Sequence, residues 1–142
     1  MKVWVLNGPN LGQLGIREPA IYGTATYDDL VAFVTAAGTE LGVEVDVRQT
    51  DDEGTMLGWL HVASAACDAV VLNPGAWTHT SVALRDAAAS LTVPFVEVHL
   101  SNPLAREEFR HTSYTAGLAK GMITGFGPNS YALALRALVS GS

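Results

Sequence analysis

The most constraining feature of this sequence is an alternation of short apolar segments with segments of helical periodicity, repeated five times along the chain. The apolar segments are rich in β-branched residues, which is typical of strands buried inside a sheet. They cover residues 3–6, 43–48, 69–73, 92–99 and 121–124. This alternation predicts a parallel sheet covered by helices on both faces, with right-handed crossovers.

Helical spacing of apolar residues marks the segments that follow these strands. The first helix should begin near Tyr27, with Thr26 as its N-cap, and the others should cover about 55–66, about 81–90 and the segment after Pro128. Five strands in a chain of this size predict a flavodoxin-like three-layer α/β sandwich with strand order 2-1-3-4-5.

The chain length and charge limit the classes of function. With 142 residues, we expect a single catalytic domain spanning 1–142. The net charge of −6 argues against a nucleic-acid surface. The single cysteine, Cys67, lies in an apolar context that predicts a buried, inert thiol and fits a reducing cytosol. With no signal-peptide pattern and no apolar run near the roughly 20 residues of a membrane helix, we expect a cytoplasmic protein without membrane partners.

Polar residues gather where three of the predicted strands end. They lie at 10–22, 73–79 and 99–110. In the predicted strand order, the loops after strands 1, 3 and 4 open into one crevice, which is where doubly wound α/β proteins bind ligands. We therefore expect the functional centre of the chain there.

Tyr22 and Arg17 in the first loop form a candidate base. A nearby guanidinium lowers the pKa of a phenol, because it favours the phenolate. A phenolate can remove a proton from carbon next to a ketone. Taken alone, a tyrosine in a loop is more often simply packed or exposed, and an arginine is more often a solvated charge.

His99 and Glu97 form a candidate acid. They are two residues apart on a strand, so their side chains point to the same face. A carboxylate beside an imidazole orients it and favours its protonated form, which suits a general acid. Taken alone, His99 also fits a hydrogen-bonded histidine at a strand end.

Neutral polar residues next to the strands are candidates for binding. The amides of Asn10 and Asn73 can hold an enolate or a water, although Asx-turns explain them equally well. Ser101 and the backbone amides of Leu100 and Ser101 can bind a carboxylate, and the planar fork of Arg110 can bind hydroxyls or an anion.

Metal and nucleotide cofactors are not expected. His79 lies near His99 in the predicted crevice, but the sequence has no H-x-x-x-H and no pair of cysteines at ligand spacing. The glycines at 8, 12 and 15 match neither of the two common phosphate-binding loop patterns.

Three blocks of the sequence together resemble type II 3-dehydroquinate dehydratase, the type II dehydroquinase of the shikimate pathway. They are LNGPNLGQLGIREPAIYG at 6–23, NPGAWTHTSVALRDA at 73–87 and EVHLSNPLAREEFRHTSY at 97–114. The resemblance implies a lyase that converts 3-dehydroquinate to 3-dehydroshikimate by anti elimination through an enolate, without cofactor or metal. It also implies a homododecamer, a tetramer of trimers.

The resemblance also implies a lid loop at about 10–23 over the active site, and roles for individual residues. Tyr22 is similar to the base, Arg17 to the residue that activates it, and His99, oriented by Glu97, to the acid. Asn10 would help hold the enolate. Substrate binding would fall to the following residues: Asn73, His79, Leu100, Ser101, Arg110, and Asp86, which resembles a residue that reaches a neighbouring subunit's site.

The sequence departs from the family pattern at Gly12, Gln13, Trp77 and Leu104. None of these is the proposed base, its arginine or the acid. We therefore expect the departures to change the rate of lid movement and the affinity for substrate, and to leave the reaction itself in place.

The alternative classes are a receiver domain, a flavin carrier and an inactive homologue. A receiver needs an acidic cluster after strand 1 to hold Mg²⁺, but this chain has Asn7 and Asn10 there. A flavin carrier needs a phosphate-binding loop rich in Ser and Thr at the same place, and this sequence lacks one.

Overall fold

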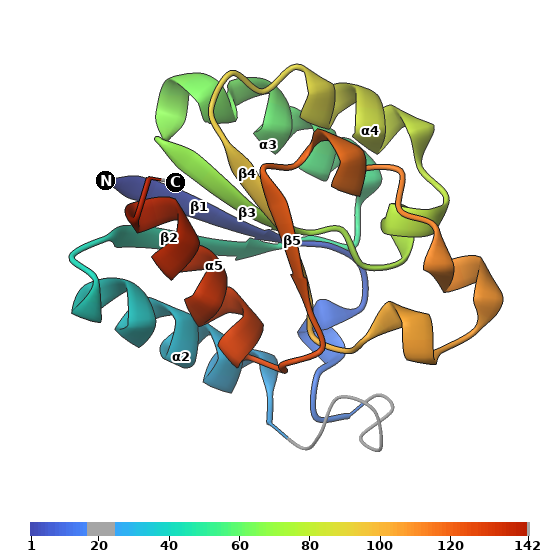
Figure 1. Ribbon diagram of the computed structural model, residues 1–142, viewed down its shortest axis with the longest axis horizontal. Helices are drawn as coiled ribbons and strands as arrows, with labels where there is room; N and C mark the ends of the chain where they lie inside the picture. Colours follow the sequence, from blue (N-terminus) through green and yellow to red (C-terminus); the bar gives the residue numbers. More distant parts are fainter. Residues whose placement is uncertain (17–24, 142) are drawn as a thin grey trace.

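The computed structural model, which describes residues 1–16 and 25–141, contains a five-stranded parallel sheet with strand order β2-β1-β3-β4-β5 (Figure 1). Its strands are β1 (Lys2–Asn7), β2 (Glu44–Gln49), β3 (Ala69–Asn73), β4 (Phe95–His99) and β5 (Gly121–Thr124). All four neighbouring pairs are parallel. The predicted fold class and strand order are confirmed.

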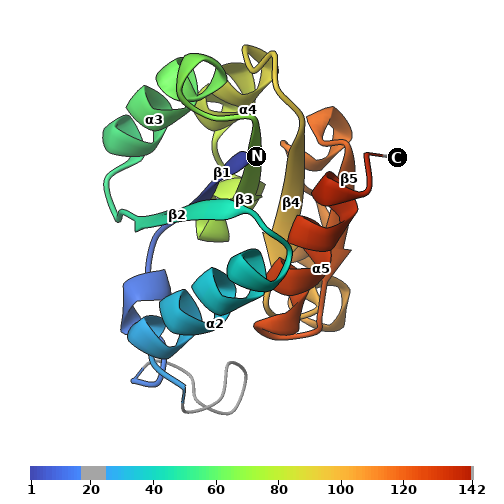
Figure 2. The ribbon, with the colours of Figure 1, turned by 90° about the vertical axis from the view of Figure 1, so that its left-hand side faces the viewer.

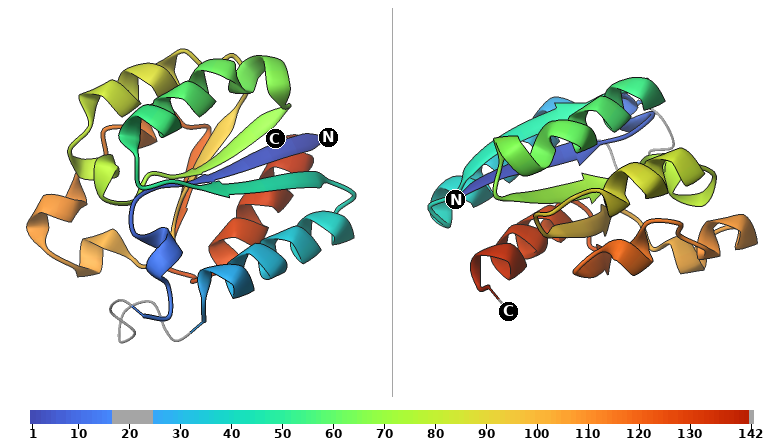
Figure 3. Two further views of the ribbon diagram at one scale, coloured as in Figure 1. Left: turned by 180° about the vertical axis from the view of Figure 1, so that it is seen from behind. Right: turned by 90° about the horizontal axis from the view of Figure 1, so that it is seen from above.

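Two layers of helices cover the sheet. The helices α2 (Tyr27–Glu40) and α5 (Asn129–Val139) lie side by side on one face, and α3 (Glu53–Ala66) and α4 (Val82–Ala89) lie on the other (Figures 2 and 3). Strand β1 alternates between the layers, because Val3 and Val5 pack with α2 and α5 whereas Trp4 and Leu6 pack with α3 and α4. The sheet is therefore buried on both faces, as the apolar strands predict.

Helix boundaries follow local capping. Thr26 accepts a hydrogen bond from the backbone N–H of Asp29, and the Asp29 carboxylate accepts one from the backbone N–H of Thr26. This capping box confirms the predicted start of α2. Helix α3 begins at Glu53, earlier than expected, because Asp52 accepts from the backbone N–H of Thr55 and acts as its N-cap.

Strand β4 is shorter than the predicted segment 92–99. It begins at Phe95, directly after Pro94, which has no N–H to donate to a neighbouring strand. The carbonyl of Pro94 still accepts from the backbone N–H of Val70 at 3.0 Å. Pairing thus starts at the proline carbonyl.

The chain segments after β1 and β3 pack directly against each other. The backbone N–H of Gly8 donates to the carbonyl of Asn73 at 2.8 Å. A Cβ on Gly8 would lie 2.5 Å from the carbonyl oxygen of Pro74, so a side chain has no room there. Gly75, at φ +59°, makes the reciprocal approach to Pro9. This contact fixes the spacing of the two loops that begin at the sheet edge.

Within the described part of the chain, every helix falls short of the length and apolar character that crossing a membrane requires.

Candidate active site

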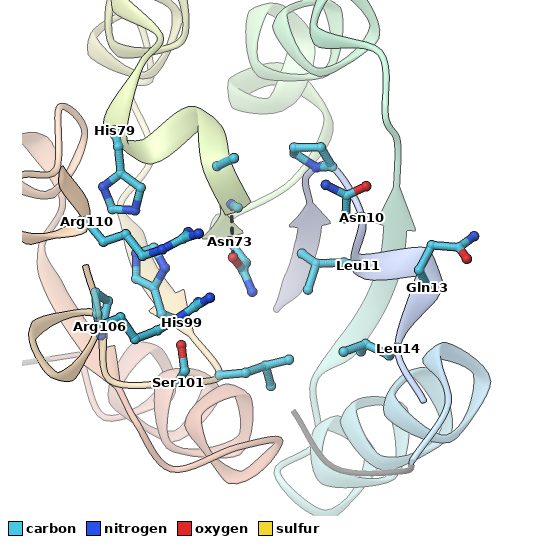
Figure 4. A pocket seen from close by; sticks show the side chains of 15 residues that line it. Asn10, Leu11, Gln13, Leu14, Asn73, His79, His99, Ser101, Arg106 and Arg110 are labelled. Carbon is cyan, nitrogen blue, oxygen red and sulfur yellow. Dashed lines mark hydrogen bonds between the residues drawn. The ribbon is translucent and has the colours of Figure 1, made fainter. Parts of the chain in front are cut away.

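A pocket lies at the carboxyl ends of β1, β3 and β4 (Figure 4). Three loops supply its walls, as expected for the switch point of this fold. Among its lining residues are Asn10, Leu11, Gln13, Leu14, Asn73, His79, His99, Leu100, Ser101, Pro103, Arg106 and Arg110. The pocket thus combines neutral amides, two imidazoles and two guanidinium groups.

His99 and Glu97 form a hydrogen-bonded pair at the end of β4. The Nε2 atom of His99 lies 2.9 Å from Oε2 of Glu97. Glu97 is completely buried, and the His99 side chain is 10% exposed. The carboxylate accepts, so Nε2 carries the proton in this contact and Nδ1 is the ring nitrogen left for other partners. The same-face placement predicted from their spacing is confirmed.

Two hydroxyl groups also contact Glu97. Ser113 Oγ donates to Oε2 at 2.9 Å, and Thr115 Oγ1 donates to Oε1. Burial by itself would raise the pKa of Glu97, but hydrogen bonds from His99, Thr115 and Ser113 outweigh burial and lower that pKa below its usual value. Glu97 is therefore held as a carboxylate.

His79 lies beside His99 on the same wall of the pocket (Figure 4). The two rings are stacked with centroids 6.5 Å apart. The Nδ1–H of His79 donates to the carbonyl of Thr112 at 2.7 Å, which leaves Nε2 for a ligand. Desolvation, together with the charges of His99 and Arg110, lowers the pKa of His79 below its ordinary value. His79 is thus a neutral group at neutral pH.

Asn73 is oriented by contacts on both sides of its amide. Its Oδ1 accepts from the backbone N–H of Gly75 at 3.1 Å, and its Nδ2 donates to the hydroxyl of Tyr131 at 2.8 Å. Tyr131 donates in turn to Oδ1 of Asn7 at 2.6 Å. The Asx-turn interpretation of Asn73 therefore holds, and the same residue also lines the pocket.

Asn10 differs from Asn73. It adopts a left-handed backbone conformation at φ +68°, and its backbone N–H donates to Oδ1 of Asp51 at 2.8 Å. Its side chain caps no backbone N–H of the 3-10 turn that follows at Leu11–Gln13. The side-chain amide of Asn10 therefore does not form the Asx-turn that the sequence left open, and Asn10 lines the pocket.

Arg106 and Arg110 give the pocket its positive charge. Glu107 lies between them, with Oε1 at 3.1 Å from Nε of Arg110 and 3.8 Å from Nε of Arg106. Hydrogen bonding from Arg110 lowers the pKa of Glu107. A pocket with two guanidinium groups favours an anionic ligand.

Comparison with known proteins identifies the family. The family described as "Dehydroquinase class II" matches residues 1–139. The chain belongs to the class II dehydroquinase family. The resemblance to type II dehydroquinase is thereby confirmed, as is the prediction that the chain is an enzyme.

Similar proteins cover nearly the whole chain. A 3-dehydroquinate dehydratase of Mycobacteroides abscessus is 57% identical over 140 residues, which are 99% of this chain and 97% of the relative. One of Salinispora tropica is also 57% identical over 140 residues, covering 99% and 98%. The crystal structure of type II dehydroquinase from Propionibacterium acnes superposes with a TM-score of 0.95 at 52% identity, covering 98% of this chain and 96% of that chain. These comparisons favour a dehydroquinase over a receiver domain or a flavin carrier.

The structure brings most of the residues expected from the dehydroquinase motifs to one pocket. These are Asn10, Asn73, His79, His99, Leu100, Ser101 and Arg110. Glu97 lies directly behind His99. Asp86 is exposed on α4 and is not among the residues that line this pocket. Tyr22 and Arg17 lie outside the described residues.

Sequence reasoning missed the residues that support the dehydroquinase pocket from behind. Ser113 and Thr115 contact Glu97, and Tyr131 joins Asn73 to Asn7. One signal was present for Asn7, because β1 and β3 both end in Val-Leu-Asn, and the structure pairs Asn7 with Asn73 in register.

Proposed function

We propose that this chain dehydrates 3-dehydroquinate to 3-dehydroshikimate by an anti elimination, with Tyr22 as base and His99 as acid. The base removes a proton from C2, and the electrons of that C–H bond form an enolate with the neighbouring ketone. Collapse of the enolate expels the C1 hydroxyl, which leaves as water after taking a proton from His99. Membership of the family and the names of its relatives support the overall dehydration.

The observation that carries the proposal is the His99–Glu97 pair at the wall of a polar pocket. Glu97 accepts from Nε2 and compensates the charge of a protonated imidazole. Nδ1 is then the atom that donates its proton to the leaving hydroxyl. An ionised partner and a low exposure favour proton delivery to a ligand in the pocket over exchange with solvent.

The remaining pocket residues fit the substrate's other groups. Arg110 and the neutral His79 would bind ring hydroxyls, and Ser101 with the backbone amide of Leu100 would bind the carboxylate. The amides of Asn10 and Asn73 would stabilise the enolate and the departing hydroxyl as neutral donors. For Tyr22 and Arg17 the support is the sequence motif, in which the arginine precedes the tyrosine by five residues. A guanidinium close to a phenol lowers the pKa of that phenol, so the pair would supply a phenolate base.

Exchange of the C2 proton separates the two steps. After addition of 3-dehydroquinate in D2O, product formation is followed at the enone absorbance and C2 deuteration by NMR. His99→Ala should lower product formation by roughly 10²- to 10⁴-fold, the usual contribution of a general acid, while C2 exchange continues. Tyr22→Phe should abolish both processes, because no base remains.

Matched controls are available on the surface. His61 and Tyr114 are exposed and do not line the pocket. His61→Ala and Tyr114→Phe should therefore turn over like the unchanged enzyme. Loss of exchange in His99→Ala would contradict the division of labour, and absence of product from the unchanged enzyme would contradict the function, as for an inactive homologue. Activity should also be unaffected by a chelator.

Three expectations from the sequence remain predictions. They are the single catalytic domain over 1–142 with a lid loop at about 10–23, the cytoplasmic location, and the homododecamer built as a tetramer of trimers. In the dodecamer, Asp86 would act in a neighbouring subunit's site. Sedimentation equilibrium gives the mass that decides the oligomer, and 12 copies of the 14.9 kDa chain are expected.

A further inference from the structure

Glu97 receives hydrogen bonds from two different parts of the chain. His99 contacts it from β4, and Ser113 and Thr115 contact it from the segment between two 3-10 turns that precedes β5. Thr115 is completely buried, like Glu97 itself. The backbone N–H of Tyr114 donates to the carbonyl of Thr78 at 2.9 Å, which fixes this segment against the loop after β3.

The direction of the Ser113 hydroxyl is set by its other contacts. Its oxygen accepts from the backbone N–H of Ala116 at 3.0 Å and from that of Thr115 at 3.3 Å. With both acceptor positions used, the remaining hydroxyl proton points to Glu97, whose two carboxylate oxygens lie 2.9 and 3.2 Å away. Ser113 therefore acts as a donor to Glu97, and it has no free lone pair for a protonated carboxyl group.

We propose that Ser113 and Thr115 are positioning residues for the acid of this enzyme: their hydroxyl groups hold the Glu97 carboxylate where it accepts from Nε2 of His99 and keeps Nδ1 directed into the pocket. The inference rests on the proposed function in that it takes His99 as the acid. Neither Ser113 nor Thr115 lines the pocket, so both act on the acid through Glu97.

Two described titratable side chains interact electrostatically with Glu97: His99 on β4 and His79 after β3. The neighbours of Glu97 in the sheet are Leu72 on β3 and Met122 on β5, which are uncharged. Hydrogen bonds from His99, Thr115 and Ser113 are the leading interactions that stabilise the carboxylate.

Removal of a hydroxyl donor should make a buried carboxylate easier to protonate. A hydrogen bond to a charged group contributes enough free energy to move such an ionisation by about one pH unit. Once protonated, Glu97 no longer balances the charge of His99. The acid limb of the kcat–pH profile, where the active form is lost, should then move to higher pH.

Thr115→Val and Ser113→Ala test this directly. The ionisation of Glu97 in the free enzyme is followed by NMR of its side-chain ¹³C carboxyl signal, which does not depend on turnover. We expect the midpoint to rise by about one pH unit in each variant. Thr39→Val and Ser90→Ala remove hydroxyl groups that bond to helix carbonyls in α2 and at the end of α4, and they should leave the midpoint unchanged.

The kcat–pH profile supplies the second readout. On the acid limb, each variant should have a roughly tenfold lower kcat than the unchanged enzyme at the same pH, with recovery at higher pH. Thr115→Ser keeps the hydroxyl and should restore the original profile. An unchanged Glu97 midpoint, or a uniform loss of kcat at every pH, overturns the proposal. Should Thr115→Val not fold, Ser113→Ala and Thr115→Ser decide it. A shifted midpoint in an enzyme that does not dehydrate 3-dehydroquinate would refute the proposed function while upholding the hydroxyl contacts.

Discussion

At the scale of single residues, His79 makes the stability of the fold depend on pH. Its pKa is lowered, chiefly by desolvation, from an ordinary value of 6.5. Between the lowered pKa and 6.5, the unfolded chain binds a proton that the native imidazole does not bind. Stability should therefore fall as the pH decreases through this window, and the loss should be complete below the lowered pKa.

His79→Asn separates this effect from those of the other histidines. An asparagine can still donate to the carbonyl of Thr112, but it does not titrate. The melting temperature of the unchanged protein should drop by a few degrees more than that of His79→Asn between pH 7.5 and 5.5. Equal drops in the two proteins would contradict a neutral His79. The contribution of Glu97 is separate, because its lowered pKa matters only below its ordinary value of 4.5.

Residue-level prediction succeeded where the contacts are local in sequence. The alternation of a strand was sufficient to pair Glu97 with His99, two residues apart. Ser113 and Thr115 lie 16 and 18 residues from Glu97, in a segment without regular periodicity, so no pattern indicates their contact. Strand ends indicate where a site lies, whereas the supporting contacts depend on loop packing.

At the scale of elements, the contact between the loops after β1 and β3 depends on Gly8. In Gly8→Ala, the new Cβ would meet the carbonyl oxygen of Pro74 at 2.5 Å, so the backbone of one loop must move. Asn10 lies two residues after Gly8, and Asn73 directly precedes Pro74. This movement should therefore displace the side-chain amides of Asn10 and Asn73 in the pocket. We expect a loss of about 1–3 kcal/mol of stability, together with a raised KM for the substrate.

Gly58→Ala is the matched control for this substitution. Gly58 lies in α3 and is exposed, and a Cβ there would have no neighbour within 4 Å. Alanine should stabilise the helix by about 0.5–1 kcal/mol. Urea denaturation of both variants should thus give changes of opposite sign. If Gly8→Ala left the free energy of unfolding unchanged, the close backbone approach at Gly8 would not be what holds the two loops together.

Element prediction was accurate where apolar periodicity is strong. The strand at Gly121–Thr124 and the helix start at Tyr27 were both predicted from the sequence, the latter from its Thr26 cap. The predicted boundaries were wrong where a single hydrogen-bonding group sets the end of an element. Strand β4 begins later than predicted because of Pro94, and α3 begins earlier than predicted because Asp52 caps it. These boundaries depend on which N–H finds a partner, and apolar periodicity does not contain that information.

At the scale of the whole molecule, Tyr131 connects the last helix to the first and third strands. It is completely buried in α5, and it contacts Asn7, which is 124 residues away in the sequence, as well as Asn73. Burial raises the pKa of Tyr131, so it remains a neutral phenol that donates to one amide and accepts from the other. The two amides lie side by side in register at the ends of β1 and β3.

Tyr131→Phe should therefore affect both stability and substrate binding. It leaves Oδ1 of Asn7 without its donor and Nδ2 of Asn73 without its acceptor, both in a buried setting, which should cost about 1–3 kcal/mol in urea denaturation. The Asn73 amide then keeps only the contact of its Oδ1 with the N–H of Gly75, so its orientation in the pocket is held less firmly and KM should rise more than kcat falls. Tyr114→Phe removes the hydroxyl of an exposed tyrosine and should change stability by less than about 0.5 kcal/mol. If the two variants were equally stable and bound substrate alike, the link between α5 and the strand ends would have no energetic significance.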